Sequence, residues 1–373
     1  DVSIAAIGLA IGVQNAVVLA LQLPFGYLSD AHSRTLVLGI SLVTGTLGAV
    51  LTALSPSYYW LLGAQVILGV GVAGHHPAHY PLLAAVSTAE NRGRAYSAHA
   101  FGGAVGLAAP YAVVAATTAL GLSWRVAVGV VAALGAAYAA YCLYGFRAVD
   151  DEITRPGLAE RPDRRPTLRS VPGRIRSLFR TLAASRGILA LTVLAFLTSA
   201  SAWAIRTYTP SLLAAGYGLP DGSASALTAA MLVVGSGLIL VGGALTDRIG
   251  TGPVVVVGYA LLTVVAVLLA TLALPPLALG VVLLFSGSIS LSRPARSSLA
   301  DALSARADLG KNFALVTIGI SLGGAVAPPV FGYLIDAVGL ARSFAVVAAL
   351  GACSLALGWR IVRDAERTAT GAS

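Results

Sequence analysis

Charged residues are scarce in this sequence. Only 10% of the 373 residues are Asp, Glu, Lys or Arg, whereas 57% are hydrophobic and the mean hydropathy is +0.85. A soluble domain carries about 25% charged residues, so this chain lacks the polar surface that a soluble fold needs. Apolar runs at residues 36–54, 125–146, 254–274 and 343–359 each approach the roughly 20 residues that cross a hydrocarbon core. The composition therefore predicts an all-α membrane protein with many spans.

Groups that perform covalent chemistry are also missing. The only cysteines, Cys142 and Cys353, fall in separate apolar runs and have neither metal-ligand spacing nor a disulfide framework. No glycine-rich loop is followed by lysine, and no nucleophile lies beside a base. We therefore expect no enzyme activity, no catalytic residues, no cofactor and no metal site. Both cysteines are expected to pack as small apolar side chains.

Eleven stretches are apolar enough to cross a membrane. Hydropathy and turn residues place them at residues 3–25, 36–54, 59–86, 95–118, 125–146, 187–213, 223–245, 253–273, 277–302, 313–334 and 342–361. If the turn at residues 30–34 is cytoplasmic, one set of loops holds 19 of the 24 basic residues. This asymmetry follows the positive-inside rule and predicts a multi-pass protein of the cell membrane, with its C-terminus in the cytoplasm.

The connecting segment at residues 148–186 is rich in arginine. Such a segment has the composition of a cytoplasmic loop beside anionic lipid, so we expect the bilayer as its partner and not nucleic acid. Apolar residues recur there at helical spacing, at Val171, Ile175, Leu178 and Leu182. This pattern predicts an amphipathic helix at the inner membrane surface.

The sequence repeats itself at an offset of 217 residues. Gly26-Tyr-Leu-Ser-Asp30 is matched by Gly243-Ala-Leu-Thr-Asp247, and His76-Pro77-Ala78-His79 by Arg293-Pro294-Ala295-Arg296. Gly102 and Gly106 correspond to Gly319 and Gly323. Because charged, proline and glycine positions stay in step, the pattern indicates a duplicated helical bundle.

The repeat also predicts how the chain is divided. The span at 187–213 has no counterpart, since its partner would precede residue 1, and the sequence begins with Asp1. We therefore expect an intact fold of two pseudo-symmetric six-helix bundles, with the first helix absent and eleven spans present. Residues 1–147 would form one bundle, residues 148–186 the cytoplasmic linker, and residues 187–373 the second bundle with a short tail.

The turn at residues 26–34 resembles a known family signature. Gly26-Tyr-Leu-Ser-Asp30-Ala-His-Ser-Arg34 is similar to the Gly-x-Leu-x-Asp-Arg-x-Gly-Arg loop of the major facilitator superfamily, and Gly243 to Arg248 is similar to its echo in the second half. Ala31 and Ser33 depart from that pattern. The resemblance implies a secondary transporter in which Asp30, Arg34, Asp247 and Arg248 hold the inner helix ends in one conformational state. A simple turn cap is the alternative.

One segment is similar to the fosmidomycin-resistance branch of that superfamily. It comprises Gly71-Val-Ala-Gly-His75-His76-Pro77-Ala and the following Asn91-Arg-Gly-Arg94. Two departures weigh against a drug–proton antiporter. Gln65 lies where such proteins carry an arginine, and Gly106-Leu-Ala-Ala109-Pro110 lacks the glycine pair of their fifth helix.

Three arginines lie inside apolar spans. Arg206 precedes Pro210 by one turn, and Arg293 and Arg296 lie one turn apart. An ionisable group in hydrocarbon is costly unless it faces a cavity or a partner. The family resemblance implies that these helices line a central cavity, where guanidinium groups would bind an anionic solute in bidentate fashion. The alternative is that Arg293 and Arg296 extend to the inner headgroups.

Three histidines occupy the matching positions of the first half. His76 and His79 align with Arg293 and Arg296, and His75 is adjacent. They are candidates for substrate binding or for carrying a proton. Alternatively, they hydrogen-bond to backbone groups that Pro77 and Pro81 leave free.

Taken with the resemblance, these features predict a monomeric secondary transporter for a small, anionic organic solute. Proton-coupled efflux, by an antiporter, is the leading interpretation. Uptake or exchange of organic anions is the second, because it needs no antiporter signature. A membrane sensor or assembly subunit that does not transport is the third, and the intramembrane cations argue against it.

Overall fold

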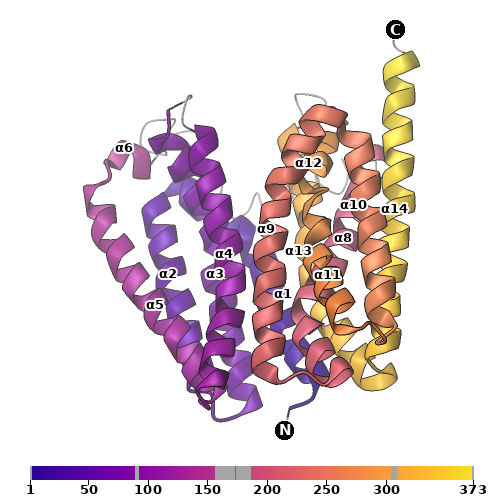
Figure 1. Cartoon of the computed structure of the whole chain (residues 1–373). Helices are drawn as coiled ribbons and strands as arrows, with labels where there is room; N and C mark the ends of the chain where they lie inside the picture. The colour runs from indigo at the N-terminus through magenta and orange to yellow at the C-terminus, as the bar shows by residue number, and fades with distance from the viewer. Residues whose placement is uncertain (1, 89–91, 156–172, 174–185, 304–308, 372–373) are drawn as a thin grey trace.

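The computed structural model is helical throughout the part of the chain that it describes, residues 2–88, 92–155, 173, 186–303 and 309–371 (Figure 1). The first half contains α1 (Ile4–Ala31), α2 (Arg34–Ala53), α3 (Tyr58–Val86), α4 (Arg92–Ala119) and α5 (Trp124–Gly145), followed by the short η1 (Phe146–Ala148) and α6 (Asp151–Thr154). The second half contains α8 (Arg186–Ser211), η5 (Leu212–Gly216), α9 (Asp221–Ile249), α10 (Thr251–Ala270), α11 (Pro276–Phe285), η6 (Ser286–Ser290), α12 (Arg293–Ala302), α13 (Leu309–Val338) and α14 (Leu340–Gly371).

The described helices have the length and composition of membrane spans. Ten helical stretches are long and apolar enough to cross a bilayer, and α11, η6 and α12 together form one of them. α3, which has 29 residues, is not among these ten but lies at the position of the remaining predicted span. Gln65 and three histidines interrupt its apolar sequence. The prediction of an all-α membrane protein is confirmed, and described helices occupy all eleven of the predicted positions.

Helix boundaries follow the repeat found in the sequence. An offset of 217 residues maps the start of α1 at Ile4 onto the start of α9 at Asp221. It also maps both ends of α2 onto both ends of α10, and the start of α4 onto the start of α13. No described helix of the first half corresponds to α8. The two halves therefore repeat the same helix order, as the sequence predicts.

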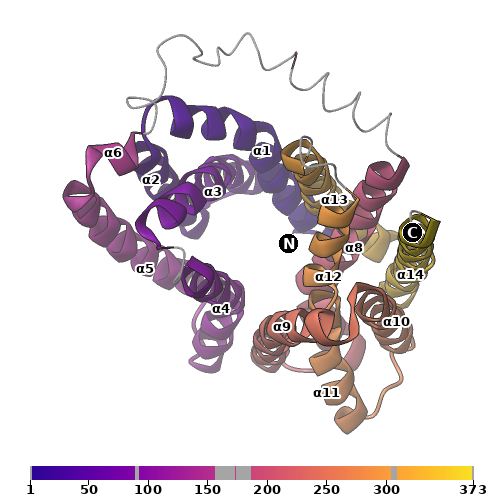
Figure 2. The ribbon, with the colours of Figure 1, turned by 90° about the horizontal axis from the view of Figure 1, so that it is seen from above.

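The halves meet along two helix pairs that the repeat relates to each other. α1 packs against α13, and α4 packs against α9 (Figure 2). The repeat maps α1 onto α9 and α4 onto α13. It therefore converts the α1–α13 pair into the α9–α4 pair. This arrangement is the one expected of two bundles related by a pseudo-two-fold axis.

Small residues allow the close approach of α1 and α13. A side chain at Gly8 would collide with the carbonyl of Pro328, and one at Gly12 would lie 2.8 Å from the ring of Pro329. Asp336, near the end of α13, accepts a hydrogen bond of 2.8 Å from the backbone N–H of Ala5, which is one of the unpaired amides at the start of α1. Close packing and a helix cap thus join the halves at this end of the bundle.

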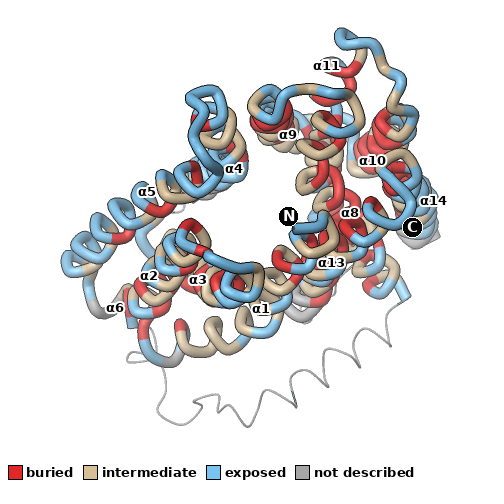
Figure 3. Tube along the Cα trace, turned by 90° about the horizontal axis from the view of Figure 1, so that it is seen from below, coloured by how far each residue is buried: buried red, intermediate tan, exposed pale blue. Residues whose placement is uncertain are grey.

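The hydrophobic core is concentrated in the second half. Buried side chains lie mainly on α8, α10 and the inner faces of their neighbours (Figure 3). The first half has a smaller buried cluster around Val37, Leu38 and Ala78. The difference follows from the helix inventory, because α8 packs against α13 and α14 and has no described counterpart in the first half.

Two spans differ in detail from their predicted form. The stretch at 277–302 is not one helix: it passes through the 3₁₀ segment η6, and α12 starts again at Arg293. Pro294 cannot donate to the carbonyl of Ser290, and Gly287 packs against Gly235, where no side chain fits. The span at 187–213 continues through the π-helical turn η5 to Gly216, just after Pro210.

The ends of the chain lie at opposite ends of the bundle. α1 begins at the lower end in Figure 1, whereas α14 ends at the upper end, where α2 and α8 also begin. The upper end carries the basic residues that the sequence assigns to the cytoplasm, among them Arg147, Arg186 and Arg363. The orientation in the membrane and the domain boundaries stay predictions. The expected amphipathic helix at residues 171–182 lies outside the described residues, apart from Gly173.

Candidate functional site

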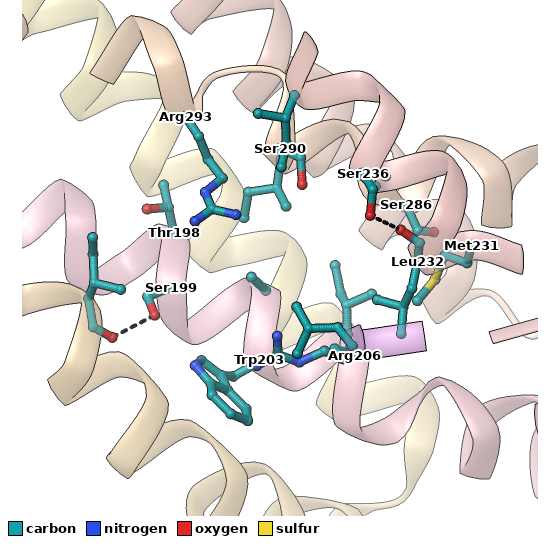
Figure 4. A pocket seen from close by; sticks show the side chains of 18 of the residues that line it. Thr198, Ser199, Trp203, Arg206, Met231, Leu232, Ser236, Ser286, Ser290 and Arg293 are labelled. Atoms are coloured by element: carbon teal, nitrogen blue, oxygen red, sulfur yellow. Dashed lines mark hydrogen bonds between the residues drawn. The ribbon is translucent and has the colours of Figure 1, made fainter. Parts of the chain in front are cut away.

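A cavity of about 290 Å³ lies within the second half. α8, α9, η6 and α12 supply most of its lining (Figure 4). Single side chains come from neighbouring helices, with Leu107 on α4, Tyr259 on α10 and Ile320 on α13. The break in the 277–302 span places Ser286, Gly287 and Ser290 on the wall of this cavity.

All three intramembrane arginines line this cavity. Arg206 comes from α8, and Arg293 and Arg296 come from the first turn of α12. The guanidinium group of Arg293 points into the cavity and not along the helix toward its end (Figure 4). Arg296 is buried, with 9% of its surface exposed, and its Nη1 donates a hydrogen bond of 2.8 Å to Thr198 Oγ1. The structure therefore gathers three cations from two helices at one site.

The aromatic side chain one turn earlier on α8 holds Arg206. The guanidinium carbon of Arg206 lies 3.7 Å from the ring centroid of Trp203. Such stacking stabilises a cation by about 0.5–2 kcal/mol and leaves its N–H groups free to donate. Arg206 is therefore oriented by Trp203 while its hydrogen-bonding edge remains available to a solute.

A tyrosine from the other half fixes the backbone at Arg206. Pro210 has no N–H group, so the carbonyl of Arg206 loses its usual partner four residues later. Tyr111 on α4 donates a hydrogen bond of 2.9 Å to that carbonyl. The bond satisfies a buried acceptor and connects the two bundles beside the cavity.

Three serine hydroxyls of the cavity already donate hydrogen bonds. The hydroxyls of Ser199, Ser236 and Ser286 donate to backbone carbonyls at 2.7–3.0 Å. Their oxygens can then only accept further hydrogen bonds. No aspartate or glutamate is among the described residues that line the cavity. Among the described lining residues, positive charge therefore comes from the arginines alone.

The histidines do not share this cavity. His75 and His76 line a separate pocket of about 260 Å³ between α2, α3 and α5, together with Ser41, Gly71 and Tyr138. His79 is buried, and its ring centroid lies 3.9 Å from that of His99 on α4. The structure brings the three arginines together and the histidines together, but it places the two groups at different sites.

In α3, the carbonyl that Pro81 leaves without a helical donor is not bound by a histidine. Pro81 leaves the carbonyl of Pro77 without a helical donor, and Ser29 of α1 donates to it at 3.3 Å. His79 instead donates from Nδ1 to the carbonyl of His75, at 2.8 Å. The histidine side chains are therefore not used at the carbonyl that Pro81 frees.

The loop signature lies at the upper end of the bundle. Arg34 begins α2, and its Nη1 donates to the carbonyl of Ile153 on α6 at 3.2 Å. Asp30 is exposed near the end of α1, and a Cβ at Gly26 would lie 3.7 Å from Pro77 Cβ on α3. In the second half Asp247 and Arg248 are exposed at the end of α9. Arg34 thus attaches the segment after α5 to the start of α2, and the gating role of the four charged residues stays a prediction.

Sequence reasoning missed four residues of these sites: Thr198, Trp203, Tyr111 and His99. The contact of Trp203 with Arg206 could have been predicted, because the two residues are one helical turn apart. Pro210 also signalled that the carbonyl of Arg206 needs a donor. The donor itself comes from α4, and no local pattern identifies it. His99 was missed for the same reason, since its partners lie on the preceding helix.

Curated relatives match about half of the chain. A probable 4-methylmuconolactone transporter of Cupriavidus pinatubonensis is 33% identical over 195 residues, which are 50% of this chain and 42% of that protein. Protein spinster homolog 1 of Xenopus laevis is 27% identical over 180 residues, 48% of this chain and 34% of that protein. The chain therefore matches less than half the length of either relative.

Solved structures match nearly the whole chain. A bacterial homologue of the human lysosomal transporter Spinster, in an inward-facing and unoccupied conformation, has a TM-score of 0.74 at 16% identity. The match covers 97% of this chain and 90% of that one. A D-xylose-proton symporter has a TM-score of 0.72 at 17% identity, covering 96% and 88%. At these identities the likeness establishes the fold alone.

The family assignment rests on the chain as a whole. The family model described as Major Facilitator Superfamily matches residues 1–307 and again residues 191–373. The repeated helix order and the paired contacts of α1 with α13 and of α4 with α9 agree with it. This chain belongs to the Major Facilitator Superfamily, a family of membrane transporters and not of enzymes.

Proposed function

We propose that this protein is a secondary transporter that moves a small organic anion across the cell membrane by alternating access. The observation that carries the proposal is the presence of Arg206, Arg293 and Arg296 at one cavity that no described acidic residue lines. Three cations without a counter-charge repel one another, and burial makes the repulsion costly. An anionic solute would remove that cost, so the site favours anions over neutral or cationic molecules.

The dimensions and chemistry of the cavity support a small solute with an apolar part. Its volume of about 290 Å³ is near the lower limit of ordinary ligand pockets. Ile205, Leu232 and Ile239 offer an apolar wall, whereas the arginines offer forked donors for a carboxylate or phosphonate. One relative is named as a probable transporter of a small organic molecule, 4-methylmuconolactone.

Coupling and direction form the finer part of the proposal. Proton-coupled efflux is the first form, with the C-terminus in the cytoplasm and His75, His76 or His79 as the candidate proton carrier. Uptake or exchange of the same anions is the second form, and it uses the same cavity. In both forms, we propose that the protein acts as a monomer.

Flux measurements on arginine variants test the site. In proteoliposomes, Arg206→Ala, Arg293→Ala and Arg296→Ala should each raise the KM for an organic anion by about ten- to a hundredfold, because each removes a charged hydrogen bond of about 1.5–3 kcal/mol. The corresponding lysine variants should recover only part of the loss, since ammonium lacks the planar fork.

Arg360→Ala is the matched control. Arg360 is exposed on α14, where it pairs with Asp364 at 3.9 Å, far from the cavity in sequence and on another helix. Its variant should transport as the unaltered protein does. Equal losses in Arg360→Ala and in the cavity variants, or full activity in all three alanine variants, would refute the anion site.

A further inference from the structure

Four of the five histidines of this protein gather between α3 and α4. His75, His76 and His79 come from α3, and His99 comes from α4. The side-chain nitrogens of His75, His79 and His99 available for ligation lie within 4.8 Å of one another. We propose that these three imidazoles bind a divalent transition-metal ion of the zinc class.

The hydrogen bonding of His79 leaves one nitrogen available as a ligand. Its Nδ1 contacts the carbonyl of His75 at 2.8 Å, and because a carbonyl only accepts, Nδ1 carries the proton. Nε2 then presents a lone pair. That atom is buried and has no hydrogen-bond partner, and the residue is only 7% exposed. Metal-bound histidines commonly donate their second N–H to a carbonyl in this way.

The spacing along α3 supports the same conclusion. His75 and His79 are four residues apart, so their side chains lie on one face of the helix. Two histidines at this spacing form half of several known zinc sites. Their ring centroids are 4.5 Å apart, and His99 approaches from the next helix with its ring 3.9 Å from His79 and 6.2 Å from His75.

The geometry requires only small movements. Zinc–nitrogen bonds of about 2.0–2.1 Å place the ligand atoms of a tetrahedral site about 3.3 Å apart. Binding would therefore require rotation of the imidazole rings, which brings the nitrogens from within 4.8 Å of one another to that separation. Three neutral imidazoles also suit Zn²⁺, Ni²⁺ or Cu²⁺ better than Mg²⁺ or Ca²⁺, which prefer oxygen ligands.

The location gives the ion a route from water. His79 lies seven residues before the end of α3 and His99 seven residues after the start of α4, each about 10 Å from the end of its helix. His75 also lines the pocket between α2, α3 and α5. The fourth coordination position is open to water or to a small anion, as in exchangeable zinc sites. The site is distinct from the arginine cavity and does not depend on anion binding there. It shares His75 and His79 with the proposed proton carrier, so a bound ion and a proton would compete for the same nitrogens.

Metal titration of the full chain tests the proposal. The protein is purified with a tag that contains no histidine, stripped with a chelator, and titrated with Zn²⁺ by calorimetry. We expect about one equivalent to bind. Co²⁺ in its place should give the visible absorption bands of a low-symmetry site with nitrogen ligands.

Variants locate the ion. His99→Gln, at one of the two partly exposed ligands, should weaken Zn²⁺ binding by more than about tenfold and remove the Co²⁺ bands. His32→Gln is the matched control, because His32 is the fifth histidine and lies at the end of α1, outside the cluster. It should bind as the unaltered protein does, and gel filtration should show both variants intact. Absence of stoichiometric binding, unchanged binding in His99→Gln, or an equal loss in His32→Gln would overturn the proposal.

Discussion

Pro210 and Tyr111 illustrate how single residues shape the arginine cavity. The proline frees the carbonyl of Arg206 and precedes the π-helical turn of η5, while Tyr111 supplies the missing donor from the opposite bundle. The backbone that carries Arg206 is thus held by a hydrogen bond that exists only while α4 and α8 stay in place. A change at Tyr111 should affect both the stability of this state and the position of the cation.

Tyr111→Phe should lower the stability of the purified protein. The variant leaves the carbonyl of Arg206 buried without a donor, at a cost of about 1–3 kcal/mol. A lower midpoint of thermal unfolding in detergent would report the loss. Tyr141→Phe is the control, because Tyr141 is 75% exposed on α5. Equal midpoints for Tyr111→Phe and the unaltered protein would show that the bond contributes nothing.

Thr198 tests how Arg296 is positioned. Thr198→Val removes the acceptor for Arg296 Nη1 but keeps the shape of the side chain. Arg296 would then lose its fixed orientation, and the KM for an anion should rise by about five- to tenfold while the maximal rate changes less. A flux assay separates the two quantities. Thr192→Val on the same helix is the control, since Thr192 bonds only to the carbonyl of Ile188 and does not line the cavity.

At the scale of helices, close glycine contacts hold the broken span against α9. A Cβ atom at Gly242 would collide with the carbonyl of Leu291, and Gly287 packs against Gly235. No heavy atom lies within 4 Å of the place where a Cβ at Gly243 would stand. A side chain is therefore excluded at Gly242 but has free space at Gly243.

This difference yields a matched pair of variants. Gly242→Ala should destabilise the protein by about 1–3 kcal/mol, because either α9 or the segment at Leu291 must move. Gly243→Ala should be neutral or slightly stabilising, since alanine favours a helix over the unfolded chain. Thermal unfolding in detergent measures both. Similar midpoints for the two variants would contradict the packing described between α9 and the break.

The sequence predicted helices better than their interruptions. Hydropathy and the 217-residue repeat placed all eleven spans, because the bilayer demands long apolar stretches and the duplication repeats their boundaries. Pro294 signalled a disturbance in the span at 277–302, but the extent of the break at Ser286–Ser290 was missed because Gly287 also packs against Gly235 of α9. The arginines were found as intramembrane cations, whereas Tyr111 and His99 reach their partners from α4, and only tertiary structure reveals such contacts.

At the scale of the molecule, contacts between the halves gather at the end where α1 begins. Asp336 caps α1 there, and a Cβ at Gly222 of α9 would lie 3.6 Å from Thr118 Cβ on α4. Toward the other end, no heavy atom lies within 4 Å of a Cβ at Gly102 or Gly103 of α4, or at Gly243 of α9. We infer that the bundle is closed at the first end and that transport requires this end to separate.

Cross-linking tests that inference. With Cys142 and Cys353 replaced by serine, a Thr118→Cys and Gly222→Cys pair has the Cβ separation of a disulfide. Oxidation should link the pair and stop flux, and reduction should restore it. A Gly102→Cys and Gly243→Cys pair, at the open end, should cross-link far less. Full transport by the oxidised Thr118–Gly222 pair would show that this end need not open.

The proposed anion site requires a solute with negative charge. The most direct measurement is flux in proteoliposomes of matched pairs of small organic molecules, each a carboxylate and its neutral carboxamide. The two members of a pair differ little in size, so charge decides between them. We predict that carboxylates cross and compete with one another, whereas the carboxamides do neither. Equal transport of both members, or a preference for lipophilic cations, would contradict the assignment of Arg206, Arg293 and Arg296 to an anion site.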